Sequence, residues 1–447
     1  MSRAVLFASL LIPLGACELA GAGADAAPGD GPGGAHTRVA KATGGHRRGA
    51  AVAAAEGPVL YPEGRRHSPI TGEVAAHLRA IADAGPGQDD HVFAKIGDSI
   101  TEGAGFLRCF DGGKVDLDGR RRLRATIDHF LAGDADGVSP FARASVAAVS
   151  GWSARGPLDG TPSYLDQELA TLAPRYATVM FGTNDVDYRG HDRFASDLWT
   201  IVDTLIDHGV VPVLSTIPPR DDDAEVDARV PVFNQLIRAL AQGRQIPLVD
   251  FHAELMALPD HGLWRDGVHP STSHHGACDL TAEGLQSGYD VRNLITLEGL
   301  DRARRAVAGE AAPDHEATHR LGRGSHDDPF VADGATVDLG DTRGGERLID
   351  RYDGCGADQD ERGPEIVYRL DLDHEAVVEA YVVDRDDTDV DVHILAGDLD
   401  GAACVGRGHQ DASATVGPGP VYVVVDSFTD ADGTAHAGEY LLAIRTR

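Results

Sequence analysis

The chain is poor in basic residues, and it has no long hydrophobic run after its N-terminal region. It holds 40 Lys and Arg against 71 Asp and Glu, which gives a formal net charge of −31. This balance argues against nucleic-acid binding, because a phosphate backbone is bound by neutralising it with Lys and Arg. No later apolar stretch is long enough for a transmembrane helix. No G-x-S-x-G motif occurs either, which excludes the nucleophile elbow of α/β-hydrolases.

The N-terminus predicts a lipoprotein of the bacterial cell envelope. Arg3 precedes an apolar run over residues 4–14, which is too short to span a bilayer but suits a signal peptide. The run ends in Leu-Gly-Ala-Cys at residues 14–17, which resembles the bacterial lipobox. We therefore expect residues 1–17 to be a lipoprotein signal, with an acyl anchor on Cys17 that holds the chain on the extracytoplasmic side of a membrane. An ordinary signal peptide with an incidental cysteine is the alternative.

Few cysteines are left for disulfides. Apart from Cys17 the chain has Cys109, Cys278, Cys355 and Cys404, which allow three pairings. An oxidising compartment favours disulfides over free thiols. If the two domains predicted below are correct, pairing within each domain gives Cys109–Cys278 and Cys355–Cys404.

Composition divides the chain into two folded units with linkers. Residues 18–57 are rich in Ala, Gly and Pro without a hydrophobic period, which predicts a disordered tether. Residues 309–340 are polar and Gly-rich, which predicts a second linker. From residue 341 to 447 apolar residues alternate with polar ones over residues 366–372, 390–394, 421–425 and 440–444. This period of two predicts a small all-β sandwich.

Residues 58–308 alternate short apolar strands with amphipathic helices. We expect strands over residues 92–96, 144–149, 177–181, 210–215 and 246–249, and helices over residues 71–84, 164–172, 194–207, 232–242 and 294–308. This alternation predicts an α/β fold in which helices cover both faces of a parallel sheet. Such folds carry their chemistry in loops at the carboxyl ends of the strands.

Three motifs in these loops supply what ester hydrolysis requires. GDSIT lies at residues 97–101, GTND at residues 182–185 and DGVHP at residues 266–270. Serine needs an adjacent base to become a nucleophile. We assign Ser99 as nucleophile and His269 as base, with Asp266 fixing the tautomer of His269.

The developing oxyanion needs hydrogen-bond donors. We expect them from the N–H of Ser99, the N–H of Gly151 in the SGWS segment, and the side-chain amide of Asn184. Structural roles are the alternative, with Ser99 as a helix cap, Asn184 closing a turn and His269 as a surface histidine. Their joint occurrence favours catalysis.

On these motifs the chain resembles the SGNH (GDSL-type) hydrolases. The resemblance covers roughly residues 60–307 and implies a flavodoxin-like three-layer α/β/α sandwich. Carried over by motif, it implies Ser99 as nucleophile, Gly151 and Asn184 in the oxyanion hole, and His269 with Asp266 as the rest of the triad. The implied activity is hydrolysis of carboxylic O-acyl or O-acetyl esters, without metal or other cofactor.

Residues 108–140 make a longer connection between the first two motifs than we expect for this family. We predict that this segment decorates the rim of the site. A Cys109–Cys278 disulfide would tie it to a position shortly after His269. We hypothesise that the bond braces the nucleophile and base loops against each other.

The sequence is also compatible with two other functions. His315, Glu316 and His319 form an HExxH pattern, which on a helix binds zinc in metalloproteases. Pro313 disrupts a helix there, and no methionine follows to form the Met-turn, which favours a solvated linker.

The C-terminal sandwich, in turn, resembles the bacterial pre-peptidase C-terminal domain through DVDVHI (389–394), PVYVVVDS (420–427) and GEYLLAI (438–444). Such modules accompany secreted hydrolases without being catalytic. They leave open a glycan-binding or adhesion lipoprotein whose hydrolase domain is silent. An inactive hydrolase domain is disfavoured because the predicted catalytic residues are all intact, namely Ser99, Asp266, His269 and Asn184.

Overall fold

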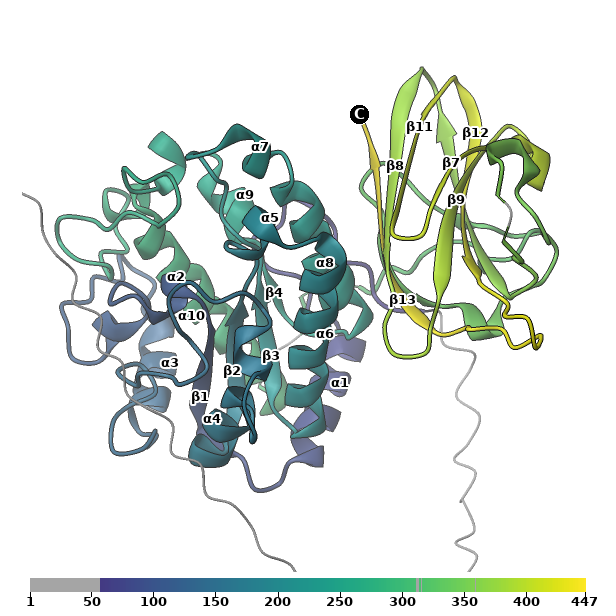
Figure 1. Ribbon diagram of the computed structural model, residues 1–447. Helices are drawn as coiled ribbons and strands as arrows, with labels where there is room; N and C mark the ends of the chain where they lie inside the picture. Colours follow the sequence, from purple (N-terminus) through teal and green to yellow (C-terminus); the bar gives the residue numbers. More distant parts are fainter. Residues whose placement is uncertain (1–56, 311–312, 315, 358) are drawn as a thin grey trace, which may run out of the picture. The chain divides into compact units, whose positions relative to one another are not determined.

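The computed structural model describes residues 57–310, 313–314, 316–357 and 359–447. The predicted signal peptide with Cys17, almost all of the predicted tether, and His315 lie outside the described residues. The described chain folds into an α/β domain and a β-sheet region that follows it (Figure 1). Within these ranges no helix combines the length and the apolar character needed to cross a membrane.

The α/β domain is built on a parallel sheet of order β1-β2-β3-β4. Its strands are β1 (Asp89–Gly97), β2 (Pro174–Met180), β3 (Val211–Ser215) and β4 (Leu248–Val249). The main helices are α1 (Gly72–Ala84), α3 (Arg122–Leu131), α4 (Tyr164–Leu172), α6 (His191–Asp207), α8 (Val230–Gly243) and α10 (Gly288–Val307). Helices α1 and α3 pack against α10, and α6 packs against α8 (Figure 1). The α/β fold predicted from the alternation is confirmed.

The strand predicted over residues 144–149 is wrong. This segment makes a single bridge, in which Ala148 pairs in parallel with Gly97 at the free edge of β1. Upstream of the bridge the backbone bonds to side chains instead of a ladder, since the N–H of Val146 donates to the Glu168 carboxylate at 3.2 Å. The bridge still brings the SGWS segment beside the GDSIT motif.

Residues 108–140, which we predicted to lie at the rim of the site, also contain α3. Phe130 of this helix makes edge contacts with Phe93 of β1 and with Phe141, at ring-centroid distances of 5.0 and 6.2 Å. All three rings are fully buried. Much of the extra length is therefore a crossover helix that supplies part of the core.

The C-terminal region consists of two sheets, of order β10-β9-β12-β7-β5 and β11-β8-β13-β6. Their strands are β5 (Phe330–Val331), β6 (Val337–Asp341), β7 (Glu365–Leu372), β8 (Ala376–Val383), β9 (Val390–Ala396), β10 (Cys404–Gly408), β11 (Asp411–Val416), β12 (Gly419–Ser427) and β13 (Glu439–Thr446). Apolar residues of both sheets share one core, among them Tyr368 and Val423 of the first and Val378 and Leu442 of the second. Strands β5 and most of β6 fall within residues 309–340, for which we expected a linker.

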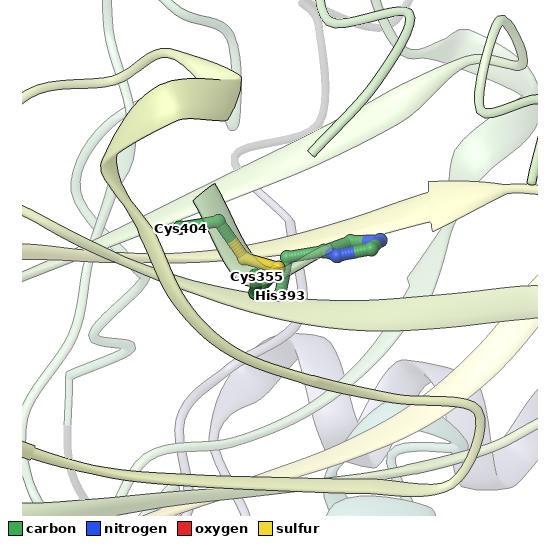
Figure 2. Close-up of side chains that lie close together, drawn as sticks. All are labelled: Cys355, His393 and Cys404. Atoms are coloured by element: carbon green, nitrogen blue, oxygen red, sulfur yellow. A yellow bond between two sulfur atoms is a disulfide. The ribbon is translucent and has the colours of Figure 1, made fainter. Parts of the chain in front are cut away.

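Both disulfides pair within their own domain, as predicted. Cys109 bonds to Cys278 in the α/β domain, and Cys355 bonds to Cys404 in the sandwich. Figure 2 shows the second disulfide beside the side chain of His393. Each bond joins segments that are far apart in sequence, with separations of 169 and 49 residues.

Candidate active site

The nucleophile segment leaves the carboxyl end of β1 through a tight turn. Ser99 is the first residue of α2 (Ser99–Glu102), a single helical turn. Gly97 allows this turn, because a Cβ atom there would lie only 2.2 Å from Oγ1 of Thr101. The turn therefore presents the Ser99 side chain at the edge of the sheet, with its own amide at the start of a helix.

Asp98 caps this helix from a fully buried position. One carboxylate oxygen accepts a hydrogen bond from the N–H of Ile100 at 2.9 Å. The other oxygen has no hydrogen-bond partner among the described residues. Burial raises the pKa of Asp98 to about 6, although the Ile100 amide and the charge of Arg292 act in the opposite direction. In the nucleophile turn, the hydrogen bond and the nearby positive charge therefore do not fully offset the cost of burying the ionised Asp98 carboxylate.

Arg292 of α10 contacts the backbone of the nucleophile turn. No sequence motif predicted this contact. The guanidinium of Arg292 donates to the carbonyl oxygen of Ile100 at 2.6 Å and to Oγ1 of Thr101 at 2.9 Å. It also lies over the ring of Phe106, 3.8 Å from the centroid. Burial lowers the pKa of Arg292 to about 10, so the group is charged at neutral pH. One sequence-distant helix therefore fixes the backbone beside Ser99.

The three predicted triad side chains form a continuous hydrogen-bonded line. Ser99 Oγ lies 2.9 Å from Nε2 of His269, and Nδ1 of His269 lies 2.8 Å from Oδ2 of Asp266. This geometry lets Nδ1–H donate to the carboxylate and leaves Nε2 to accept the proton of Ser99. The side chains of His269 and Asp266 are 41% and 44% exposed, so the site is open to solvent.

Backbone amides of the DGVHP loop hold the Asp266 carboxylate beside the His269 ring. Its Oδ1 accepts the N–H groups of Val268 and His269, both at 3.0 Å. Burial acts to raise the pKa of Asp266, but these two amides and the ring of His269 outweigh it and lower the pKa. Asp266 is therefore a stable anion beside the imidazole.

The three predicted oxyanion donors come from the segments that follow β1, the Ala148 bridge and β2. Gly151 adopts φ of 80°, the left-handed conformation that favours glycine. Among the described residues the N–H groups of Ser99 and Gly151 have no hydrogen-bond acceptor. Asn184 donates one of its two amide hydrogens to the carbonyl oxygen of Trp152 at 2.8 Å. Its second hydrogen stays available for a substrate oxygen.

Asp185 of the GTND motif has a role that a turn residue would not have. Its fully buried carboxylate accepts the N–H of Ala154 at 3.1 and 3.2 Å to its two oxygens. Burial raises the pKa of Asp185 to about 7, against the effect of the Ala154 amide and of Arg189. With Asn184 bound to Trp152, the GTND motif thus holds the SGWS segment in place at two points.

The HExxH pattern is not arranged as a zinc protease site. Residues 316–319 form no helix, and His315 lies outside the described residues. Nδ1 of His319 lies 3.0 Å from the carbonyl oxygen of Gly57. Because the motif binds zinc through two histidines on one helical face, the described part of it lacks the required scaffold.

Comparison with known proteins bears on the same region. Residues 96–277 match the GDSL-like Lipase/Acylhydrolase family, and the match contains all the predicted catalytic and oxyanion residues. No curated protein matches the chain.

Similar solved structures include a GDSL-like lipase from Bacteroides thetaiotaomicron, with 17% identity over 52% of this chain and 99% of that chain, at a TM-score of 0.33. They also include a catalytic mutant of an acetylxylan esterase from Geobacillus stearothermophilus, with 17% identity over 48% of this chain and 95% of that chain, at a TM-score of 0.33.

Proposed function

We propose that the chain is a serine esterase with a Ser99–His269–Asp266 triad. The GDSL-like lipase/acylhydrolase domain over residues 96–277 supports ester hydrolysis as its activity. The observation that carries the proposal is the line of two hydrogen bonds, 2.9 and 2.8 Å long, that joins these side chains. Its substrates are carboxylic O-acyl or O-acetyl esters.

Acylation begins when Ser99 Oγ attacks the ester carbonyl carbon. Nε2 of His269 takes the serine proton, and the anionic Asp266 stabilises the imidazolium that forms. The negative charge that develops on the carbonyl oxygen is bound by the amides of Ser99 and Gly151 and by Asn184 Nδ2. His269 then gives its proton to the leaving alcohol, and the acyl group remains bonded to Ser99.

Deacylation repeats the same steps with water. His269 takes a proton from a water molecule, which attacks the acyl carbon and forms a second oxyanion in the same set of donors. Collapse of this intermediate breaks the bond to Ser99 Oγ, and His269 returns the proton to the serine. The exposure of His269 and Asp266 supports ready access of water to the acyl-enzyme.

Hydrolysis of p-nitrophenyl esters of increasing acyl length tests the proposal. Wild-type protein is expected to release p-nitrophenol, whereas Ser99→Ala is expected to lose about 10³-fold or more in kcat/KM. Ser413→Ala, at an exposed serine of β11, is the matched control and is expected to behave as wild type. Equal rates for wild type and Ser99→Ala would overturn the triad. No hydrolysis by either protein would also favour the silent-hydrolase alternative of an adhesion or glycan-binding lipoprotein.

We also propose an extracytoplasmic location with a lipid anchor on Cys17. Its support is the lipobox-like sequence at residues 14–17 and the two disulfides, which are typical of oxidising compartments. In a bacterial host, the protein is expected to sediment with membranes and to partition into detergent. Cys17→Ser is expected to become soluble with full esterase activity, and an unchanged distribution would contradict the anchor.

A further inference from the structure

Two histidines and a glutamate gather at a surface cavity that the esterase chemistry does not use. His274, His275 and Glu283 line this cavity of about 860 Å³ together with Asp116 and other residues. Each of the three offers one ligand atom, and these atoms all lie within 4.8 Å of one another. The cavity lies on the loop that follows DGVHP, next to the Cys109–Cys278 disulfide.

The backbone that carries the two histidines is fixed at both ends. The carboxylate of the fully buried Asp290 accepts the N–H of Ser273 with one oxygen and the N–H of Asp279 with the other, each at 3.0 Å. Cys278 is held by its disulfide. The backbone of the turn that carries His274 and His275 is therefore already ordered before a ligand binds, which lowers the entropy cost of binding.

The three side chains are close to the geometry of a metal site. The rings of His274 and His275 have centroids 3.8 Å apart, and Nε2 of His274 lies 3.9 Å from Oε1 of Glu283. Two ligands on a tetrahedral zinc ion with bonds of 2.0–2.1 Å lie about 3.4 Å from each other. The side chains of His274 and Glu283 are 69% and 72% exposed, so small rotations suffice to close the difference.

The donor set selects the kind of ion. Imidazole nitrogens with one carboxylate suit Zn²⁺ and its neighbours among the transition metals, whereas Ca²⁺ and Mg²⁺ take oxygen ligands. The same cavity is lined by the carboxylates of Asp116 and Asp279 and by the ammonium group of Lys114, so its lining stays net negative, which favours a cation. We propose that His274, His275 and Glu283 form a binding site for a divalent ion of the zinc class, with water as the remaining ligand.

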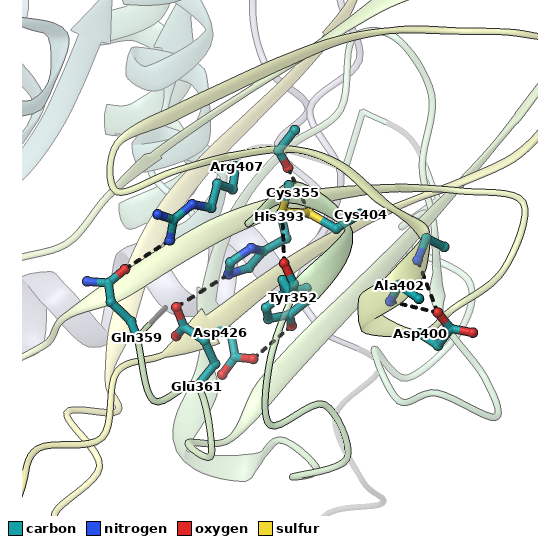
Figure 3. Close-up of a disulfide and its surroundings, with 12 residues drawn as sticks. Tyr352, Cys355, Gln359, Glu361, His393, Asp400, Ala402, Cys404, Arg407 and Asp426 are labelled. Carbon is teal, nitrogen blue, oxygen red and sulfur yellow. Dashed lines mark hydrogen bonds and ion pairs between the residues drawn. A yellow bond between two sulfur atoms is a disulfide. The ribbon is translucent and has the colours of Figure 1, made fainter. Parts of the chain in front are cut away.

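Two other groups among the described residues bring potential ligands together, and both are less suited. Cys355 and Cys404 lie near His393, but their sulfur atoms are bonded to each other and offer no thiolate (Figure 2). The ring of His393 is instead stacked on Tyr352 at 3.5 Å, with Nε2 facing Glu361 (Figure 3).

The remaining group is Asp384, Asp389 and His409. The carboxylate of Asp384 already accepts the N–H of Val390 at 2.9 Å, and Nδ1 of His409 lies 3.2 Å from Asp391. An ion there would compete with these contacts. The imidazole rings of His274 and His275, by contrast, make no hydrogen bond within the described part of the chain, although the backbone N–H of His275 donates to Ser273 Oγ at 3.2 Å.

An ion at this site would join the histidine turn to the segment that leads into α10. Glu283 lies directly before the 3₁₀ helix at Gly284–Gln286, which precedes α10. The ion binds the folded chain through ligands that the unfolded chain does not hold together, so it is expected to raise the melting temperature as its concentration rises. It takes no part in the triad chemistry.

Titration of full-length protein without a histidine tag tests this proposal. Zn²⁺ binding is followed by calorimetry, and Co²⁺ binding by the visible absorption that a low-symmetry site gives. We expect one ion per chain, and at least tenfold weaker binding in both His275→Ala and Glu283→Gln. The matched control is His91→Ala, because His91 forms another ring pair, 4.2 Å from His129, whose nitrogens contact carbonyl oxygens.

Each outcome decides the proposal. Equal affinity in wild type, His275→Ala and Glu283→Gln would mean an adventitious ion only and would overturn it. Loss of binding in His91→Ala as well would place the ion elsewhere and would also overturn it. Because the readout is binding and not ester hydrolysis, the result is independent of the triad.

Discussion

The carboxylate of Glu102 accepts hydrogen bonds from both the backbone N–H and the hydroxyl of Ser150. Glu102 ends α2, the helix that begins at Ser99, and Ser150 directly precedes Gly151. A single side chain therefore links the nucleophile helix to the loop that carries the proposed oxyanion donor.

Removing this link is expected to slow the chemical step. Glu102→Ala frees the loop at Gly151, so the oxyanion loses a positioned donor, and kcat is expected to fall about 10- to 100-fold with little change in KM. Glu102→Gln keeps an oxygen that can accept from the Ser150 amide and is expected to recover part of the loss. Steady-state kinetics on p-nitrophenyl acetate measure both values.

The control for this prediction is Asp111→Ala, which removes another carboxylate–serine contact, 2.7 Å long, between Asp111 and Ser139. It is expected to keep wild-type kinetics. A Glu102→Ala variant with unchanged kcat would mean that the loop holds its shape without this contact.

Asp98 gives the folded protein a characteristic pH dependence. Its pKa is raised from the usual 3.8 to about 6 by burial, so folding favours the protonated form. The associated stability is fully present below pH 3.8 and is lost as the pH rises through about 6. Asp98→Asn retains an oxygen for the Ile100 amide but carries no charge. Relative to wild type, the variant is expected to gain roughly 2–3 kcal/mol of unfolding free energy between pH 4 and pH 8.

Urea unfolding at pH 4, 6 and 8 measures this gain. Asp83→Asn, at an exposed position of α1, serves as the control for removal of a surface carboxylate. An Asp98→Asn variant whose stability difference from wild type stays constant across this range would contradict the assigned burial cost.

The Cys109–Cys278 disulfide is expected to support activity as well as stability. It joins residues 169 positions apart, beside the base loop, and losing such a bond typically costs about 2–5 kcal/mol. The double variant Cys109→Ser/Cys278→Ser is expected to melt at lower temperature and to lose several-fold in kcat/KM. Cys355→Ser/Cys404→Ser, which removes the sandwich disulfide, is expected to leave esterase kinetics unchanged. Full activity in the first variant would refute the proposed bracing of the two loops.

Asp266 can be separated from the nucleophile by a conservative change. Asp266→Asn still offers an oxygen to the amides of Val268 and His269, but it removes the negative charge beside the imidazole. The charge stabilises the imidazolium only in the transition state, so kcat is expected to fall about 10²- to 10⁴-fold. A fall of less than threefold would show that His269 works without its carboxylate partner.

Local sequence was sufficient for the elements whose signals are local. Helix α4 has the predicted bounds, because Ser163 and Asp166 form a capping box at its start. The GDSIT, GTND and DGVHP motifs predicted a site at the edge of the sheet, and the structure brings Ser99, Asp266 and His269 within hydrogen-bonding distance.

Local sequence did not predict features that depend on contacts between residues far apart in the chain. Residues 144–149 have the composition of a strand, yet their amides find side-chain acceptors such as Glu168. Arg292 supports the turn at Ser99 from a helix almost 200 residues away, as shown by its bond to Ile100 over a separation of 192 residues. Arg292 lies two residues before the helix predicted over residues 294–308, and α10 is buried on all sides around it, so nothing in the local sequence indicates such a contact.

Covalent labelling tests whether Ser99 is the activated nucleophile. An alkyl fluorophosphonate reacts with an activated serine and leaves a stable phosphonyl group that peptide mass spectrometry can locate. We expect one group per chain, on the peptide that contains Ser99, with labelling slowed at least 100-fold in His269→Ala. Absence of label on wild-type protein, label on another residue, or equally fast labelling of His269→Ala would contradict this role of Ser99.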